Sequence, residues 1–261
     1  MEPVLFELRD GVATIHLNKP DVFNSIAIEM ADALRAAMGR ARVEARAVVL
    51  TGSGRAFCAG ADLKSLEAAY AGGGAPVLGE LIDAAFNPIL QELVDLPMPV
   101  IAAVNGPAAG AGVGLALGCD LRIASTAAHF TMAFINIGLV PDTGTAWLLP
   151  AIVGYGRAME LSMSGRRVGA DEALAIGLVH RLVEPDQLGA EAHAWAAKLA
   201  AGPTQAYART KVLLRRAVET DLATALKAER EEQDRAGRTA DHLEGVAAFL
   251  AKRPPVYQGR P

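Results

Sequence analysis

Cysteine is scarce in this sequence, which has only Cys58 and Cys119 among its 261 residues. Two cysteines cannot build the dense disulfide framework of a small secreted domain, so we expect a reducing compartment. The opening residues, MEPVLFELRD, contain neither the basic segment nor the long apolar segment of a signal peptide. Together these absences favour a cytoplasmic location.

Positive charge is not in excess, because 25 Lys and Arg residues stand against 29 Asp and Glu residues, for a net charge of −4. Proteins that neutralise the phosphates of nucleic acids need basic residues to do so, so we expect no nucleic-acid partner. One long uncharged run, residues 96–119, is interrupted by three prolines and five glycines. A membrane span needs about 20 consecutive and predominantly apolar residues, so we expect no membrane partner.

Motifs for common cofactors are also missing. The five histidines show no metal-ligand spacing with one another or with the cysteines. A P-loop lysine and a G-x-S-x-G elbow are absent. A dinucleotide fingerprint that began at Gly110 would need a glycine where the chain has Leu115. We therefore expect no metal and no dinucleotide cofactor.

The apolar runs that are present predict an α/β fold. Residues 4–8 and 12–17 flank Asp10-Gly11 as in a β-hairpin, and further strands are predicted at 47–50, 99–104, 121–124, 130–134 and 178–183. Helices are predicted at 28–41, 77–95 with a kink near Pro88, 157–162 and 170–176, with a loop at 71–75. From residue 188 onward almost everything is predicted to be helical. We divide the chain into an α/β core, 1–195, and a C-terminal helical region, 196–261, whose apolar faces must pack on the core or on a neighbouring subunit.

Two corners of small residues are prominent, at Gly60-Ala61 and at Gly110-Ala111. Each lies where a predicted strand turns towards a helix, so each can point a backbone N–H group at a ligand. Two such groups that converge on one carbonyl oxygen would form an oxyanion hole, worth about 3–4 kcal/mol per donor. The alternative is that small residues at these corners only allow close packing.

Asp142 is the acidic residue best placed for catalysis, because it follows Pro141 in an apolar stretch and precedes a predicted helix. The same position suits an aspartate that caps a helix, and the sequence leaves both interpretations open. A helix N-terminus would lower the pKa of Asp142, and apolar surroundings would raise it. Asp62 has the same ambiguity, whereas Asp120 is interpreted as structural.

Three segments carry a family resemblance: residues 55–63 (RAFCAGADL), residues 99–106 (PVIAAVNG) and the pair Cys119-Asp120. Together they resemble the crotonase superfamily of enoyl-CoA hydratases and isomerases, and the likeness extends over nearly the whole chain. The resemblance implies a crotonase-like spiral of ββα units with a C-terminal helical trimerisation region, in a homotrimer or a dimer of trimers. It also implies an acyl-CoA ligand, so that coenzyme A is part of the substrate and no separate cofactor is needed.

The resemblance further assigns a set of site residues. The backbone N–H groups of Ala61 and Ala111 would hold the thioester oxygen, with Asp142 as the acid–base residue. The residues that would bind the remainder of the acyl-CoA are Ser25, Ala59, Asp62, Leu63, Gly110, Phe134, Phe249 and Lys252. By the same resemblance, Phe249 and Lys252 would reach the CoA of a neighbouring subunit.

Two positions depart from the hydratases of this superfamily, which use two glutamates to place a water molecule on the double bond. Gly114 and Phe134 stand at those positions, and neither side chain can exchange a proton, so we expect hydration to be very slow. Asp142 matches instead the functional aspartate of dienoyl-CoA isomerases and 4-chlorobenzoyl-CoA dehalogenases. Asn87 replaces the histidine base of the dehalogenases, and Phe134 replaces their tryptophan, which disfavours dehalogenation.

Further segments most resemble the ring 1,2-epoxyphenylacetyl-CoA isomerases of phenylacetate catabolism, namely 86–88 (FNP), 105–112 (NGPAAGAG), 132–134 (MAF), 138–142 (GLVPD), 147–150 (WLLP) and 244–253 (EGVAAFLAKR). Those enzymes also move double bonds from the 3- to the 2-position of enoyl-CoA. The sequence therefore predicts a CoA-thioester isomerase with Asp142 as its proton shuttle. A general Δ3,Δ2-enoyl-CoA isomerase of fatty-acid oxidation, and a pseudoenzyme that only binds acyl-CoA, remain as alternatives. Candidates to line the acyl pocket are Phe57, Phe86, Phe134 and Trp147.

Overall fold

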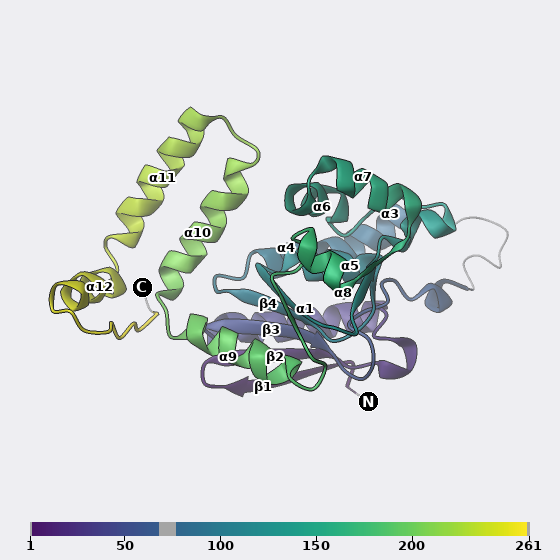
Figure 1. Cartoon of the computed structure of the whole chain (residues 1–261), viewed down its shortest axis with the longest axis horizontal. Helices are drawn as coiled ribbons and strands as arrows, with labels where there is room; N and C mark the ends of the chain where they lie inside the picture. Colours follow the sequence, from purple (N-terminus) through teal and green to yellow (C-terminus); the bar gives the residue numbers. More distant parts are fainter. Residues whose placement is uncertain (1, 68–76, 260–261) are drawn as a thin grey trace.

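The computed structural model describes residues 2–67 and 77–259, and the loop predicted at 71–75 lies outside them (Figure 1). At the centre of the described part is a six-stranded sheet in the order β1-β2-β3-β4-β6-β9. Its strands are β1 (Val4–Arg9), β2 (Val12–Leu17), β3 (Ala47–Gly52), β4 (Val100–Val104), β6 (Leu121–Ser125) and β9 (Arg181–Val183). β1 pairs with β2 as the predicted antiparallel hairpin, and every other pair in this sheet is parallel. The mixed α/β fold is thus confirmed.

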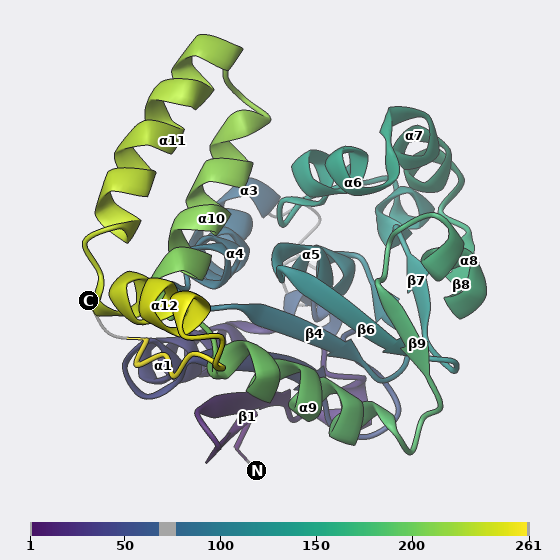
Figure 2. The ribbon, with the colours of Figure 1, turned by 60° about the vertical axis from the view of Figure 1, so that its left-hand side comes forward.

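Both faces of this sheet are buried, which is why its inner strands are almost continuously apolar. On one face, Ile15, Leu50 and Ala102 pack with α1 (Ile28–Glu44) and the helices that follow β3 and β4. On the other face, Val49 and Ile101 pack against α9 (Leu188–Ala200), which crosses the strands in Figure 2. The proposed division at 195/196 falls inside α9, and the buried residues of this helix continue past it to Ala200. The two-part division itself stays a prediction.

A smaller sheet carries the second corner. It contains β5 (Ala108–Ala109), β7 (His129–Thr131) and β8 (Arg167–Gly169), and β5 leads through Gly110 into α5 (Ala111–Gly118). The single strand predicted at 130–134 is wrong at its C-terminal end, because β7 stops at Thr131 and a 3-10 helix, η4 (Ala133–Ile137), follows. The remaining elements of this half are α6 (Thr145–Val153), α7 (Tyr155–Ser164) and α8 (Ala170–Ala175).

The long helix predicted at 77–95 is interrupted close to the predicted kink. α3 (Leu78–Leu81) runs into a π-helical turn, η3 (Ile82–Phe86), and then into α4 (Asn87–Val94). Pro88 stands in the first turn of α4, and its missing N–H group cannot complete the α-helical ladder. The wider turn accommodates this gap.

The C-terminal helices α10 (Thr204–Ala217), α11 (Leu222–Ala236) and α12 (Ala240–Leu250) project from the core on the side away from α6 and α7 (Figures 1 and 2). Asp120 anchors the first of them, since its carboxylate pairs with Lys211 at 2.7 Å and with Arg215 at 3.3 Å and also accepts the N–H of Val100 at 2.8 Å. The structural interpretation of Asp120 is confirmed. No helix in the described ranges has the length and apolarity needed to cross a membrane.

Candidate active site

The two small-residue corners meet in space. The segment 58–62 lies between residues 23–26 and β5, because Ala61 forms a bridge with Ile26 and Cys58 forms one with Ala108. The N–H of Ala109 donates to the carbonyl of Cys58 at 2.9 Å, and the N–H of Asp62 donates to the carbonyl of Ile26 at 3.0 Å. These bonds hold the two corners in contact although 50 positions separate them in the sequence.

Ala61 and Ala111 are the two residues at these corners whose N–H groups remain available. Within the ranges 2–67 and 77–259, neither N–H donates a hydrogen bond. Each alanine follows a glycine with a positive φ, +89° at Gly60 and +52° at Gly110, a backbone conformation that glycine adopts without strain. The corners therefore present two backbone donors, as an oxyanion hole requires.

The small residues also allow the close packing that was the alternative interpretation. A Cβ atom placed on Gly60 would lie 2.7 Å from the carbonyl oxygen of Ala109 and 3.2 Å from the nitrogen of Ala111. One placed on Gly112 would overlap the carbonyl oxygen of Cys58. The two interpretations are compatible, because the close approach is what brings the two donors together.

Asp142 lies in the loop before α6, and the structure excludes the helix-cap interpretation. Gly144 is the N-cap residue of α6, and no side chain caps that helix. The Asp142 carboxylate accepts instead the hydroxyl of Thr143 at 2.8 Å. Burial raises the pKa of Asp142 above its ordinary value of 3.8, and the hydrogen bond from Thr143 offsets part of this effect. Burial is therefore the larger of these two effects on the carboxylate, and the expectation that apolar surroundings raise its pKa is confirmed.

The Asp142 loop rests on the helix that begins at the second corner. A Cβ atom on Gly114, in the first turn of α5, would lie 2.5 Å from the carbonyl oxygen of Thr143 and 3.0 Å from Oγ1 of Thr145. Thr143 has a φ of +47°, in the left-handed region that a β-branched residue seldom adopts. The loop therefore packs directly on α5, the helix that begins with Ala111 and its free N–H group.

The aromatic candidates for an acyl pocket have different environments. Phe134 is buried, and its ring lies 3.8 Å from the place of a Cβ atom on Gly110. Phe57 and Phe86 belong to the main hydrophobic core, and Phe86 also borders a pocket beside Ala61. Trp147 is 43% exposed on α6, so the structure does not place it in an enclosed pocket.

Four of the eight residues predicted to bind the acyl-CoA lie around the first corner. Asp62 lines a pocket of about 260 Å³ together with Ala61, Ile26 and Phe86. Asp62 also accepts the N–H of Lys64 at 3.1 Å and so caps η2 (Leu63–Leu66), as its structural interpretation predicts. Ser25, next to Ile26, is buried, and its hydroxyl has no hydrogen-bond partner among the residues that the structure describes, whereas Ala59 and Leu63 are exposed.

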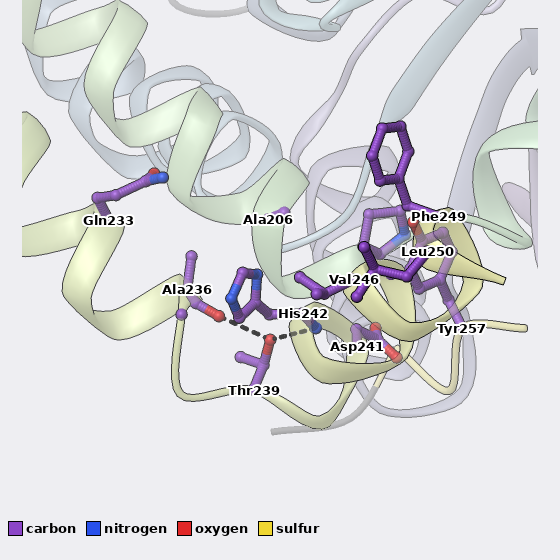
Figure 3. Close-up of a pocket in the computed structure, with 13 residues that line it drawn as sticks. Ala206, Gln233, Ala236, Thr239, Asp241, His242, Val246, Phe249, Leu250 and Tyr257 are labelled. Atoms are coloured by element: carbon purple, nitrogen blue, oxygen red, sulfur yellow. Dashed lines mark hydrogen bonds between the residues drawn. The ribbon is translucent and has the colours of Figure 1, made fainter. Parts of the chain in front are cut away.

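Phe249 and Lys252 are not part of this cluster. Phe249 is 82% exposed near the end of α12, and Lys252 lies just beyond that helix. Figure 3 shows Phe249 at the edge of a separate pocket of about 440 Å³ formed by α10, α11, α12 and Tyr257. In one chain α12, which carries Phe249, lies apart from α5 (Figures 1 and 2). Their role at the CoA of a neighbouring subunit stays a prediction.

Other reactive groups are either buried or dispersed. Burial raises the pKa of Cys58 and of Cys119 to about 12, so both thiols are protonated at neutral pH. In the part of the chain that the structure describes, His, Cys, Asp and Glu side chains form no group of three that could hold a metal ion.

The sequence singled out neither Thr143 nor Thr145, although both contact this site. Thr143 donates to Asp142. Thr145 is buried beside Gly114, and its hydroxyl finds no hydrogen-bond partner in residues 2–67 and 77–259. Two threonines that follow Asp142 before an apolar helix were the available signal.

A comparison with protein families settles the wider identity, since the Enoyl-CoA hydratase/isomerase model matches residues 7–260. The chain belongs to the enoyl-CoA hydratase/isomerase family. This family member is 42% identical over 262 residues to the 1,2-epoxyphenylacetyl-CoA isomerase of Escherichia coli, with 100% of both chains covered. It is 43% identical over 260 residues to a Rhodobacter capsulatus protein named "Probable enoyl-CoA hydratase", with 98% of each chain covered.

The family member also shares its fold with solved structures. An enoyl-CoA hydratase from Bacillus anthracis superimposes with a TM-score of 0.91 at 33% identity, covering 99% of this chain and 100% of that one. The crotonase resemblance and the fold class are thereby confirmed. Proteins named as isomerases and as hydratases both stand among the relatives, so the reaction has to be argued from the site.

Proposed function

We propose that this protein is a CoA-thioester isomerase that acts on a ring epoxide, 2-(1,2-epoxy-1,2-dihydrophenyl)acetyl-CoA, or on a linear 3-enoyl-CoA. The N–H groups of Ala61 and Ala111 bind the thioester oxygen. Asp142 takes a proton from one carbon and returns it to another. The full-length similarity to the Escherichia coli 1,2-epoxyphenylacetyl-CoA isomerase supports the ring epoxide as the first substrate to test.

The oxyanion hole makes the proton transfer possible. Two donors on the thioester oxygen stabilise the negative charge that develops there when the neighbouring carbon loses its proton. For a 3-enoyl-CoA, Asp142 removes a proton from carbon 2, the double bond shifts to the 2-position, and the same proton goes to carbon 4. The enzyme ends in its starting protonation state, and coenzyme A remains part of the substrate throughout.

The observation that carries the proposal is the environment of Asp142. Its carboxylate does not cap a helix, and its pKa is raised, which brings it closer to the value of a group that exchanges protons near neutral pH. Gly114 and Phe134 occupy the two positions where hydratases of this superfamily carry glutamates, and neither can activate water. One carboxylate beside an oxyanion hole supports isomerisation rather than the addition of water.

Steady-state rates with three substrates test this proposal. We expect turnover of the ring epoxide, of a 3-enoyl-CoA, or of both, and hydration of crotonyl-CoA slowed by about 10²–10⁴-fold for each missing glutamate. Preference for the linear substrate would assign the protein to general fatty-acid oxidation. Hydration at ordinary hydratase rates would refute the isomerase assignment, and acyl-CoA binding without turnover of any substrate would favour the pseudoenzyme alternative.

The same proposal includes a cytoplasmic homotrimer or dimer of trimers. Large apolar side chains on the C-terminal helices are exposed in the single chain, among them Leu222, Leu226, Phe249 and Leu250. Exposed apolar clusters of this kind are typical of protein–protein interfaces. In such an assembly, Phe249 and Lys252 would contact the CoA bound to the adjacent subunit.

A further inference from the structure

Asp241 holds the end of the chain against the start of α12. Its carboxylate lies in the first turn of that helix and accepts the N–H groups of Gln258 and Gly259 at 2.7 Å and 2.9 Å. Asp241 is only 2% exposed, and a buried carboxylate is stable only where hydrogen bonds replace its water. These two bonds make the tail segment, residues 253–259, fold back from the last turn of α12 to its first.

Arg46 fixes the same tail segment to the core. It lies between α1 and β3, and its guanidinium donates to the carbonyl of Tyr257 at 3.2 Å and to that of Gly202, before α10, at 2.7 Å. Gly259 packs directly on this guanidinium, because a Cβ atom placed there would lie 2.6 Å from Nε of Arg46 and 2.7 Å from Oγ1 of Thr204. Its φ of +66° also favours glycine. The tail segment therefore joins α12 to the core.

A second acidic residue of α12, Glu244, fixes the chain directly after Lys252. Its carboxylate accepts two hydrogen bonds from the guanidinium of Arg253, at 2.6 Å and 2.8 Å, and one from the N–H of Val256 at 2.8 Å. The bonds from Arg253, and after them the bond from Val256, lower the pKa of Glu244 to about 2, so this ion pair persists at neutral pH. The backbone that follows Lys252 is thus held in one course.

Lys252 itself has an unusual backbone conformation. Its φ is +51°, in the left-handed region where helices commonly end on glycine. The N–H of Lys252 donates to the carbonyl of Phe249 at 3.2 Å, and the N–H of Arg253 donates to that of Ala248 at 3.1 Å, which is the usual bonding of such a helix end. A lysine is strained there, and strain of this kind is found at functional sites. The helix end and the tail segment together set the direction in which the Lys252 side chain leaves the backbone.

We propose that the tail segment positions α12 for contact with the CoA of a neighbouring subunit, and that Asp241 and Arg46 hold it in place. The proposal rests on the proposed function, which puts Phe249 and Lys252 at that CoA. Asp241 and Phe249 border the same pocket (Figure 3), and Phe249 is too exposed for its own chain to hold it. Ordering two such side chains on binding costs about tenfold in affinity, and a helix that is already fixed avoids this cost.

Asp241→Asn tests the proposal. Asparagine keeps the shape but has one acceptor oxygen instead of two, so one of the N–H groups of Gln258 and Gly259 loses its partner. We expect KM for the acyl-CoA to rise by about tenfold with kcat within about twofold of the wild type, since Asp241 touches no reacting atom. Asp171→Asn, at an exposed aspartate in the first turn of α8, is the control and should keep both constants. An unchanged KM in Asp241→Asn would overturn the proposal.

Gly259→Ala disturbs the tail segment from its other end and leaves α12 unaltered. The added methyl group would overlap the guanidinium of Arg46, so the same rise in KM is expected. Gly177→Ala is the matched control, because Gly177 also has a positive φ, +77°, while its nearest neighbour is the carbonyl oxygen of Ile152 at 4.0 Å. An equal rise of KM in Gly177→Ala would show that backbone strain alone causes the effect, which would overturn the proposal.

A further comparison asks whether Asp241 acts through the two side chains of α12. In a protein that already carries Phe249→Ala and Lys252→Met, Asp241→Asn has nothing left to position, so KM should not rise again. Another rise of about tenfold in that background would show that Asp241 acts on something else. Asp241→Asn should also sediment with the mass of the wild type. A smaller assembly would overturn the proposal, because the tail segment would then serve assembly.

Hydrogen exchange makes the test independent of turnover. We expect the amides of α12 to exchange faster in Asp241→Asn than in the wild type, while those of α9 keep their rates. Unchanged exchange in α12 would overturn the proposal even if the wild type is an active isomerase. If the wild type isomerises neither substrate, the proposed function fails, and calorimetry with acetyl-CoA replaces the kinetics. A weaker Kd in Asp241→Asn would then support the positioning role, and an equal Kd would overturn it.

Discussion

Asp142 is a carboxylate whose surroundings favour its protonated form. Burial makes the charged form costlier, and the hydroxyl of Thr143 recovers only part of that cost. The side chain makes no helix cap that would require the charge for stability. Catalysis requires the ionised carboxylate, whereas the stability of the fold does not. Substitutions at position 142 can therefore separate the two.

Asp142→Asn should remove most isomerase activity. Asparagine is nearly isosteric and can still accept the Thr143 hydroxyl, but it cannot act as a base, so we expect kcat to fall by about 10²-fold or more with the fold and CoA binding kept. The measurement is steady-state kinetics with acyl-CoA binding by titration calorimetry as the control. Full activity in Asp142→Asn would leave the backbone donors as the only catalytic element.

The pH dependence of kcat/KM should reflect the raised pKa. Because Asp142 must be ionised to take a proton, activity should fall as the pH drops through a value above 3.8, the ordinary pKa of aspartate. A raised pKa in the folded state also means that the charge on Asp142 destabilises the fold above that pKa. At pH 7, Asp142→Asn should therefore melt no lower than the wild type, and any gain should vanish at lower pH. A lower melting temperature at pH 7 would contradict this assignment of the pKa shift.

At this scale the sequence identified most of the candidate site but not its contacts. Ala61 and Ala111 could be proposed because small residues at strand-to-helix corners are a local pattern. The contact between Gly114 and Thr143 joins residues 29 positions apart, and it depends on how the loop before α6 packs on α5. No local pattern encodes it, and for the same reason the sequence left the cap interpretation of Asp142 open.

Helix α5 is supported at its C-terminus by Arg122, at the opposite end from Ala111. Arg122 is 5% exposed, and its guanidinium donates to the carbonyls of Leu178 at 2.7 Å and Cys119 at 2.9 Å. A cation at the C-terminus of a helix opposes the partial negative charge there. Burial lowers the pKa of this guanidinium, yet an arginine stays charged in proteins.

Arg122→Met should destabilise the protein because it leaves these buried carbonyls without donors. We expect the free energy of unfolding to fall by at least about 1–3 kcal/mol, measured by urea titration. Arg166→Met is a suitable control, since Arg166 is an exposed arginine and its ion pairs with Glu160 and Glu172 are screened by solvent, so they should contribute little to stability. Equal effects of the two substitutions would show that burial of Arg122 is not decisive.

Elements with strong periodic patterns were predicted well, and those shaped by packing were not. The first hairpin, α1 and the buried strands match because their apolar spacing is regular. For the π-helical turn at 82–86, the sequence offered only Pro88, which predicted a kink. Strand β8 was not predicted at all. β8 consists of Arg167, Val168 and Gly169, which become a strand only because β7 lies beside them.

At the scale of the molecule, the C-terminal helices expose more apolar surface than the core can cover. Leu222 is 74% exposed, Leu226 54% and Leu250 75%. We expect sedimentation at micromolar protein to give three or six times the mass of one chain. Leu226→Glu should weaken this assembly, whereas Val43→Glu, at an apolar position on α1 that is 85% exposed, should not. A monomeric wild type would refute the proposed trimer.

The burial of both thiols has a practical consequence. Cys58 and Cys119 lie in the core with pKa values of about 12, so a maleimide reagent at neutral pH should leave them untouched while the protein stays folded. A cysteine introduced at Val43, on α1 and away from the C-terminal helices, would then be the only site of labelling. Donor and acceptor dyes placed there on separate samples would report, by energy transfer after mixing, how often subunits exchange. Neither of the two cysteines would therefore have to be replaced before fluorescent labelling.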